Sequence, residues 1–109
     1  MNINLQLEEI ILLLNQNKFV ESHDIFEELW RKYKNNESTR KESFILKAFV
    51  NGSVSIELYK MQRFEHCSNV WNTYKKKEYL IDEIDSLNKK NYQKIKEIIY
   101  EKREKTIKW

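Results

Sequence analysis

The sequence predicts an all-α protein, a compact single-domain bundle of about five helices that takes in residues 1–109. The chain contains one glycine and no proline, whereas chains rich in turns and strands need both residues. Apolar residues recur at helical spacing instead of alternating. Hydrophobic residues make up 40% and charged residues 34% of the chain, a balance typical of amphipathic helices with one dry and one wet face.

The first two helices are predicted over residues 4–16 and 18–33. In the first, leucine and isoleucine side chains recur at i, i+3 and i+4, with Glu8 and Glu9 on the other side. The polar run 15–17 separates the two helices. Because this connection is short, the two helices are expected to pack as antiparallel neighbours.

Three further helices are predicted over residues 39–60, 63–76 and 90–105. The longest of them carries a broad apolar face, and the last buries a set of isoleucines. The segment 78–87 is ambiguous, and it is interpreted as a short helical turn followed by a loop. No linker, internal repeat or low-complexity stretch divides the chain.

Two local patterns in the third predicted helix suggest specific contacts. Thr39 and Glu42 have the spacing of a capping box, in which each side chain bonds the backbone amide of the other. Ala48, Gly52 and Ser53 are small. We expect them to let the backbones of the second and third helices approach closely.

A polar cluster lies inside the apolar face of the second helix. At 100° per residue, His23 falls in the middle of an aromatic stripe and Glu27 falls at its edge, whereas Asp24 points to the wet side. The motif and core residues of the stripe are Phe19, Phe26 and Trp30. His23 and Glu27 are therefore expected to face the protein interior.

The spacing of His23 and Glu27 allows two interpretations. Side chains at i and i+4 of a helix are neighbours, so the pair can form a buried structural hydrogen bond. The same pair can also supply two ligands to one divalent metal ion. Asp24 and Glu57 are the further candidate metal ligands. A carboxylate on the apolar face of the third helix, such as Glu57, binds a metal, pairs with a lysine or extends to solvent.

Residues 23–30, HDIFEELW, resemble a known signature. They are similar to the H-[ED]-x-[LF]-E-x-x-W motif of the small all-helical "domain of unknown function 309" family. Phe19 stands where that family has an aromatic residue four positions before the histidine. Residues 47–59 and 63–70 resemble its third and fourth helices, so the resemblance covers roughly residues 5–76.

The resemblance implies an irregular helical bundle and carries the family's usual label, predicted metal-dependent hydrolase. It makes His23 and Glu27 the first candidate site residues and Asp24 the next. The chain departs from the family where the third helix typically holds a glutamine near its start and a histidine near its end. The residues in that region here are Lys47, Asn51, Leu58 and the ionisable Glu57. The family's G-N-x-x-G-A turn is replaced by residues 62–67.

Several functional classes are disfavoured by composition. A net charge of +3 is too small to indicate nucleic-acid binding. No apolar run approaches the ~20 residues of a membrane span, and the N-terminus lacks the features of a signal peptide, so a cytoplasmic protein is expected. Cys67 is the single cysteine. Trp109 at the chain end is a candidate apolar handle that either packs onto a second copy or folds back onto the last helix, so a homo-oligomer is one of the partners considered.

Three functions follow from these observations, and the weakest of them is nucleic-acid binding through the C-terminal lysines. The favoured one is a non-catalytic helical structural or interaction module with a buried His23–Glu27 pair. The alternative is a divalent-metal-binding protein in which that pair, joined by Asp24 or Glu57, holds a metal that activates water for hydrolysis.

Overall fold

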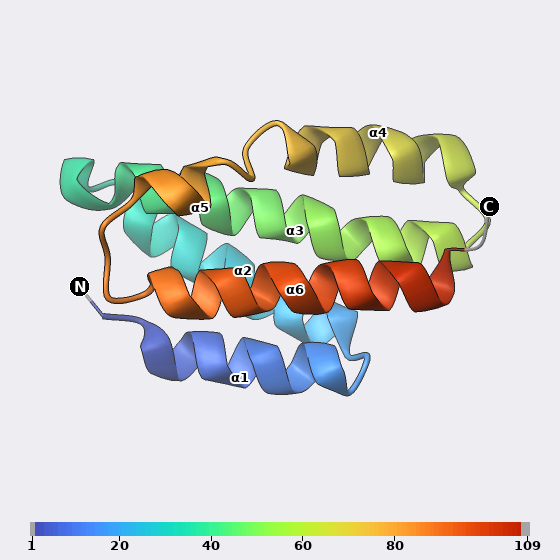
Figure 1. Cartoon of the computed structure of the whole chain (residues 1–109), viewed down its shortest axis with the longest axis horizontal. Coiled ribbons are helices and arrows are strands. Elements are labelled where there is room, and N and C mark those ends of the chain that lie inside the picture. The colour runs from blue at the N-terminus through green and yellow to red at the C-terminus, as the bar shows by residue number, and fades with distance from the viewer. Residues whose placement is uncertain (1, 108–109) are drawn as a thin grey trace.

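The structure is a computed structural model that describes residues 2–107, so Trp109 lies outside the described residues. Within that range the chain is helical, without any β-strand, as the sequence predicts (Figure 1). The elements are α1 (Asn4–Asn15), α2 (Phe19–Lys34), the 3-10 helix η1 (Glu37–Thr39), α3 (Arg40–Lys60), α4 (Phe64–Lys75), α5 (Leu80–Glu83) and α6 (Lys89–Thr106). Each of the five predicted helices agrees with a long helix of the structure to within one residue at both ends. The ambiguous segment 78–87 holds the single-turn helix α5 and then a loop.

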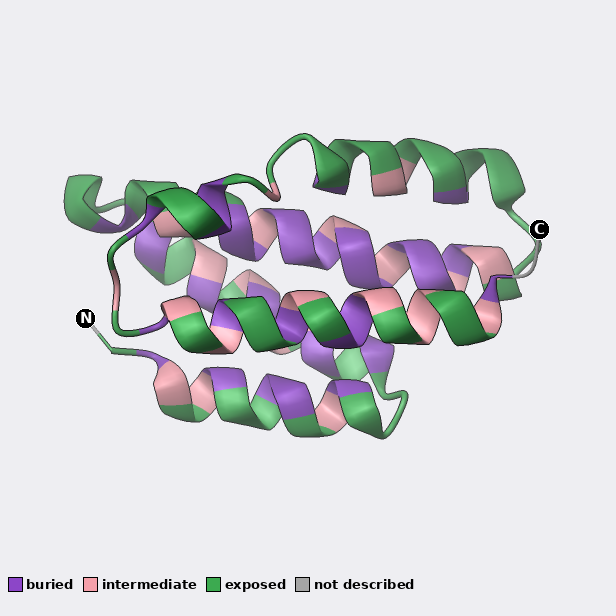
Figure 2. Ribbon diagram, in the orientation of Figure 1, coloured by how far each residue is buried: buried purple, intermediate pink, exposed green. Residues whose placement is uncertain are grey.

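Helix α3 is the central element of the bundle. Its most extensive contacts are with α2 and α4, and it also packs against α5 and α6, while α1 packs against α2 and α6. In Figure 1, α3 runs through the middle of the molecule, with α4 along the upper edge and α1 along the lower edge. Figure 2 shows α3 buried along most of its length, whereas the outer sides of α1 and α4 are exposed. Side chains on α3 therefore meet neighbours from nearly every other helix.

Phe49 of α3 is the meeting point of the aromatic core. Its ring centroid lies 5.8 Å from that of Phe26 on α2, 6.0 Å from that of Tyr74 on α4 and 6.1 Å from that of Tyr92 on α6. All four side chains are fully buried. Large rings bury more apolar area per residue than aliphatic side chains and prefer tilted or offset contacts, so one residue of α3 ties three other helices into the core.

Gly52, one of the small residues of α3, serves a different interface from the one expected. A Cβ atom on Gly52 would lie 3.3 Å from the ring of Tyr74 and 3.6 Å from Ile99 Cδ1. Gly52 therefore gives room to α4 and α6, and the expectation that it lets α2 approach is wrong. The helical wheel places Gly52 on a buried face, but only the packing of later helices decides which neighbour occupies that face.

Two helices end on a residue in the left-handed conformation. Asn17 follows α1 with φ 61° and Gln62 follows α3 with φ 62°. After Gln62, the Arg63 amide donates to the carbonyl oxygen of Leu58 at 2.9 Å, the backbone bond that closes a Schellman-type helix end. The turn after α3 therefore keeps a backbone geometry that glycine adopts most easily, although no glycine is present there.

The predicted capping box does not form. The Thr39 hydroxyl donates to the carbonyl oxygen of Tyr33 at 2.8 Å, and its side chain makes no cap hydrogen bond to α3. Glu42 instead turns toward the loop before α6, where it accepts hydrogen bonds from three side chains. Tertiary partners thus outcompete the local pairing that the spacing predicts.

Candidate functional site

His23 and Glu27 lie on the side of α2 that faces α3. His23 Nε2 is 3.9 Å from Glu27 Oε1, which is longer than a hydrogen bond. The His23 side chain is 35% exposed and that of Glu27 15% exposed. Asp24 is 80% exposed, and its Oδ1 atom lies 3.7 Å from His23 Nδ1. The expected buried His23–Glu27 hydrogen bond is therefore replaced by a looser, partly buried contact between neighbours.

The close partner of Glu27 is a lysine of α3. Lys47 Nζ donates to Glu27 Oε1 at 3.0 Å, and the same ammonium lies 4.5 Å from the centroid of the Trp30 ring. Lys34 Nζ is 4.3 Å from that ring as well. A cation held by a carboxylate and an aromatic face is stabilised by both, so Glu27 and Trp30 together bind the Lys47 side chain and join α2 to α3.

The Glu27–Lys47 pair could have been predicted from the sequence by comparing positions on α2 and α3, although the spacing within α2 does not indicate it. Glu27 lies seven residues before the last residue of α2, and Lys47 lies seven residues after the first residue of α3. Two antiparallel helices joined by a short connection place such residues side by side. A search for opposite charges at matching positions of the two helices would have identified Lys47 as the partner of Glu27.

The other aromatic residues of the motif contribute to the core to different degrees. Phe19 and Phe26 are buried, and Trp30 is partly buried. Trp30 packs against the core with one part of its ring system and meets the two lysine ammoniums with its face. Its position at the edge of the α2–α3 interface explains both contacts.

A cavity of about 220 Å³ lies between α2 and α3 on the other side of His23. It is lined by Phe19, Val20, His23, Val54 and Glu57. Helix α3 thus brings Glu57 to the same cavity as His23, as the metal interpretation requires. Glu57 Oε1 accepts a hydrogen bond from Lys60 Nζ at 3.4 Å, so its closest charged neighbour is a lysine of its own helix.

The four candidate ligands do not converge on one point. Within residues 2–107, no group of three or more His, Cys, Asp and Glu side chains is arranged to hold a metal ion. His23 touches Asp24 and Glu27 at ion-pair distance, but the Glu27 oxygen that faces His23 also holds the Lys47 ammonium. A metal at this point would have to displace that ammonium, so the residues present do not fit a ready-made divalent-metal site.

A second polar cluster surrounds Glu42 at the opposite end of the α2–α3 hairpin. Glu42 Oε1 accepts hydrogen bonds from Ser86 Oγ at 3.0 Å, Asn88 Nδ2 at 3.0 Å and Tyr92 Oη at 2.9 Å. Asn88 is fully buried. Its side-chain Nδ2 also donates to Tyr33 Oη at 3.2 Å, and its side-chain Oδ1 accepts from the backbone amide of Ile3 at 3.2 Å. One carboxylate and one amide thus connect the N-terminal segment and the beginning of α6 to α2 and α3.

The phenol groups of this cluster are held in the protonated form. Burial raises the pKa of Tyr92 above its ordinary value, and the negative charge of Glu42 raises it further. Burial likewise raises the pKa of Tyr33, again with a contribution from the Glu42 charge. Both hydroxyls therefore keep their protons to a higher pH than an exposed tyrosine does.

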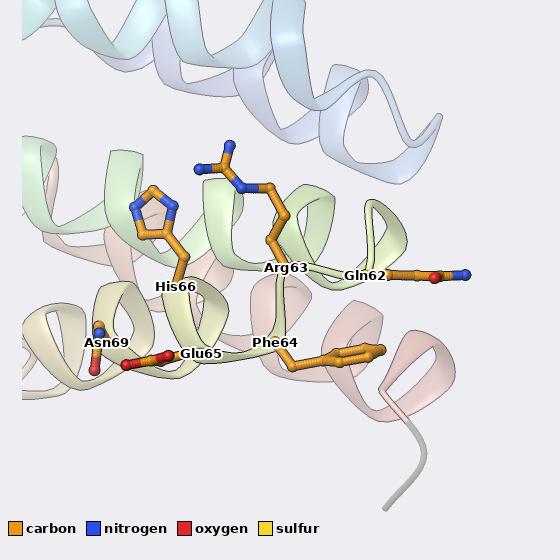
Figure 3. Close-up of a pocket in the computed structure, with 6 residues that line it drawn as sticks. All are labelled: Gln62, Arg63, Phe64, Glu65, His66 and Asn69. Carbon is orange, nitrogen blue, oxygen red and sulfur yellow. The ribbon is translucent and has the colours of Figure 1, made fainter.

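The turn between α3 and α4 forms an open depression of about 540 Å³ (Figure 3). Its lining residues are Gln62, Arg63, Phe64, Glu65, His66 and Asn69, all of them exposed. In Figure 3 the side chains of Arg63 and His66 point to the same side, whereas Gln62 and Phe64 point away from them. Cys67, the next residue, is buried. The depression is a surface feature, because none of its side chains is withdrawn from solvent.

Comparison with known proteins gives one match. A model of the family described as "Domain of unknown function (DUF309)" matches residues 7–70, which is more than half of the chain. No curated protein and no solved structure matches the chain. Among residues 2–107, no helix is both long enough and apolar enough to cross a membrane.

Removing the charge of Glu42 should weaken the contact of the α2–α3 hairpin with the α5–α6 loop and the beginning of α6. We predict that Glu42→Gln lowers the free energy of unfolding by about 1–3 kcal/mol, because charge-assisted hydrogen bonds become neutral or are lost. Urea denaturation followed by circular dichroism measures this change. The control Glu37→Gln, at an exposed position of η1, should change stability by less than about 0.5 kcal/mol. Equal effects of the two variants would contradict the role given to Glu42.

The raised pKa of Tyr92 predicts a loss of stability in alkali. A group whose pKa is higher in the folded state stabilises the protein below its unfolded pKa, about 10 for tyrosine, and loses that contribution as pH rises further. The free energy of unfolding should fall above pH 10 by about 1.4 kcal/mol per pH unit for each such tyrosine. Tyr92→Phe should make this fall less steep, whereas Tyr79→Phe, at an exposed ring, should leave it unchanged. An unaltered slope in Tyr92→Phe would rule out the linkage.

Proposed function

The chain belongs to the domain of unknown function 309 (DUF309) family, and from that premise we propose that it is a non-catalytic helical module whose motif residues hold α2 against α3. The observation that carries this proposal is the Lys47 ammonium, 3.0 Å from Glu27 Oε1 and 4.5 Å from the Trp30 ring centroid. Glu27 and Trp30 are two of the fixed positions of the motif, and both contact the same residue of α3. In this chain the motif serves helix–helix packing.

The chemistry of the pair supports a structural role. Glu27 is mostly buried, and a carboxylate in that position is costly unless a cation or hydrogen-bond donor compensates it. Lys47 provides both the charge and the donor, while its methylene stem can remain against the protein. A general base for hydrolysis would instead need a free lone pair aimed at a water or substrate.

The second candidate function is divalent-metal binding with hydrolytic activity. The proximity of His23 Nε2 to Glu27 Oε1, at 3.9 Å, favours it. For this candidate the Lys47 ammonium would have to leave Glu27 when the metal binds. His23 and Glu27 would hold the ion, which would supply an activated water, whereas Asp24 faces the other ring nitrogen of His23.

The interaction part of the proposal rests on apolar side chains at the surface. Leu5 and Leu12, seven residues apart on one face of α1, are 81% and 57% exposed. Surface leucines that recur on one helix face can bury area against a partner. Self-association and location in the cytoplasm stay predictions, and nucleic-acid binding stays disfavoured on charge alone.

The two candidates differ in how the protein responds to metal. If the motif is structural, the melting temperature should be the same in EDTA and in Zn²⁺, Mn²⁺ or Mg²⁺. Glu27→Gln should lower the free energy of unfolding by about 1 kcal/mol in every one of these conditions. The matched control is Glu28→Gln, at an exposed carboxylate of α2 that pairs with Lys32.

Elemental analysis of gently purified protein tests the structural proposal against the metal-binding candidate. A stoichiometric metal that copurifies with the wild type and disappears in His23→Ala would contradict the structural proposal and establish the second candidate. A metal-dependent rise in melting temperature that His23→Ala abolishes would have the same meaning.

A further inference from the structure

The cavity between α2 and α3 has the lining of a small ligand site. Phe19, Val20 and Val54 give it apolar walls, and His23 and Glu57 are its polar residues. Ligand sites are typically apolar pockets with a few well-placed polar groups. At about 220 Å³, it has room for about seven groups of the size of a water molecule or a methylene, so it suits a small molecule.

Charge restricts the kind of molecule that fits. Glu57 is the carboxylate among the lining residues, and its side chain is 36% exposed at the cavity edge. The hydrogen bond from Lys60 Nζ is long, at 3.4 Å, and the Lys60 side chain is itself 43% exposed. Exposed ion pairs of this kind are worth little, so a cationic ligand can replace the lysine at small cost.

The protein already presents an ammonium group to this edge. Lys60 Nζ lies 4.9 Å from the centroid of the Phe19 ring while it bonds Glu57. The same combination of ring, carboxylate and ammonium recurs further along the α2–α3 interface with Trp30, Glu27 and Lys47. An ammonium beside both a carboxylate and an aromatic face is stabilised by two attractive interactions. Lys60 therefore stands in for the head group of a ligand whose apolar part would enter the cavity.

We propose that this cavity binds a small free alkylammonium compound of about six carbons, with its ammonium on Glu57 and Phe19 and its apolar chain against Val20 and Val54. The lysine side chain of another protein carries the same head group. With its ammonium it has about five groups where the cavity has room for about seven, and unfilled apolar space weakens binding. The proposal concerns the opposite side of His23 from the Glu27–Lys47 pair and does not depend on the function proposed above.

Titration of the full-length protein with n-hexylammonium, followed by amide chemical shifts, tests the site. We expect saturable shifts at residues of α2 and α3 around the cavity, with a millimolar Kd, the range that so small a ligand reaches. The neutral analogue n-hexanol should bind about tenfold more weakly, because it lacks the charge that Glu57 recognises. The capped amino acid N-acetyl-lysine methylamide should also bind more weakly than n-hexylammonium.

Three variants separate recognition from general hydrophobic binding. Glu57→Gln should raise the Kd of n-hexylammonium about tenfold, and Lys60→Ala should lower it about threefold, because the internal competitor is gone. Glu28→Gln, an exposed carboxylate of α2 that also pairs with a lysine, should leave the Kd unchanged. The fingerprint of amide shifts without ligand shows whether each variant is folded.

The titrations distinguish a free alkylammonium compound from a lysine of a partner protein as the occupant of the cavity. Absence of saturable shifts, equal affinity for n-hexanol, or an unchanged Kd in folded Glu57→Gln would overturn the proposal. Tighter binding of the capped lysine than of n-hexylammonium would also overturn it, and would assign the cavity to a lysine of a protein partner.

Discussion

The enclosure of α3 by α2, α4, α5 and α6 is the constraint on which the arrangement of charges depends. A helix surrounded in this way has little surface left for water, so a charged side chain on it needs a partner from a neighbouring element. Glu42 finds donors in the α5–α6 loop and on α6, Lys47 finds Glu27 on α2, and Glu57 stays at the edge of a cavity. At each of these three places, a charged side chain of α3 therefore lies at the edge of the hydrophobic core.

This constraint gives the motif of α2 a physical meaning. Glu27 and Trp30 form the α2 side of a contact whose α3 side is Lys47. Lys47 stands in the part of the third helix where the family resemblance would place a glutamine. An ammonium there neutralises Glu27, whereas an uncharged amide would leave the carboxylate charge in place. The identity of this one residue therefore bears on whether this chain can offer His23 and Glu27 to a cation from solution.

The helices could be predicted from the sequence because apolar periodicity is a property of each segment by itself. The contacts of particular side chains could not, since they depend on segments far apart in the chain. Thr39 and Glu42 have capping-box spacing, yet Glu42 bonds Ser86, Asn88 and Tyr92. His23 and Glu27 are neighbours on one helix, yet the stronger partner of Glu27 comes from α3. The spacing within one helix indicates which side chains can contact each other. The packing of the other helices determines which of these contacts form.

A double-mutant cycle on Glu27→Gln and Lys47→Met measures the central claim most directly. Methionine keeps much of the apolar stem of lysine beside Trp30 and removes the charge, so the cycle isolates the ion pair. The account predicts a coupling free energy of about 0.5–1.5 kcal/mol in urea unfolding, which decreases as salt is added. A coupling of zero, with both single variants as stable as the wild type, would contradict the claim that this pair holds α2 against α3.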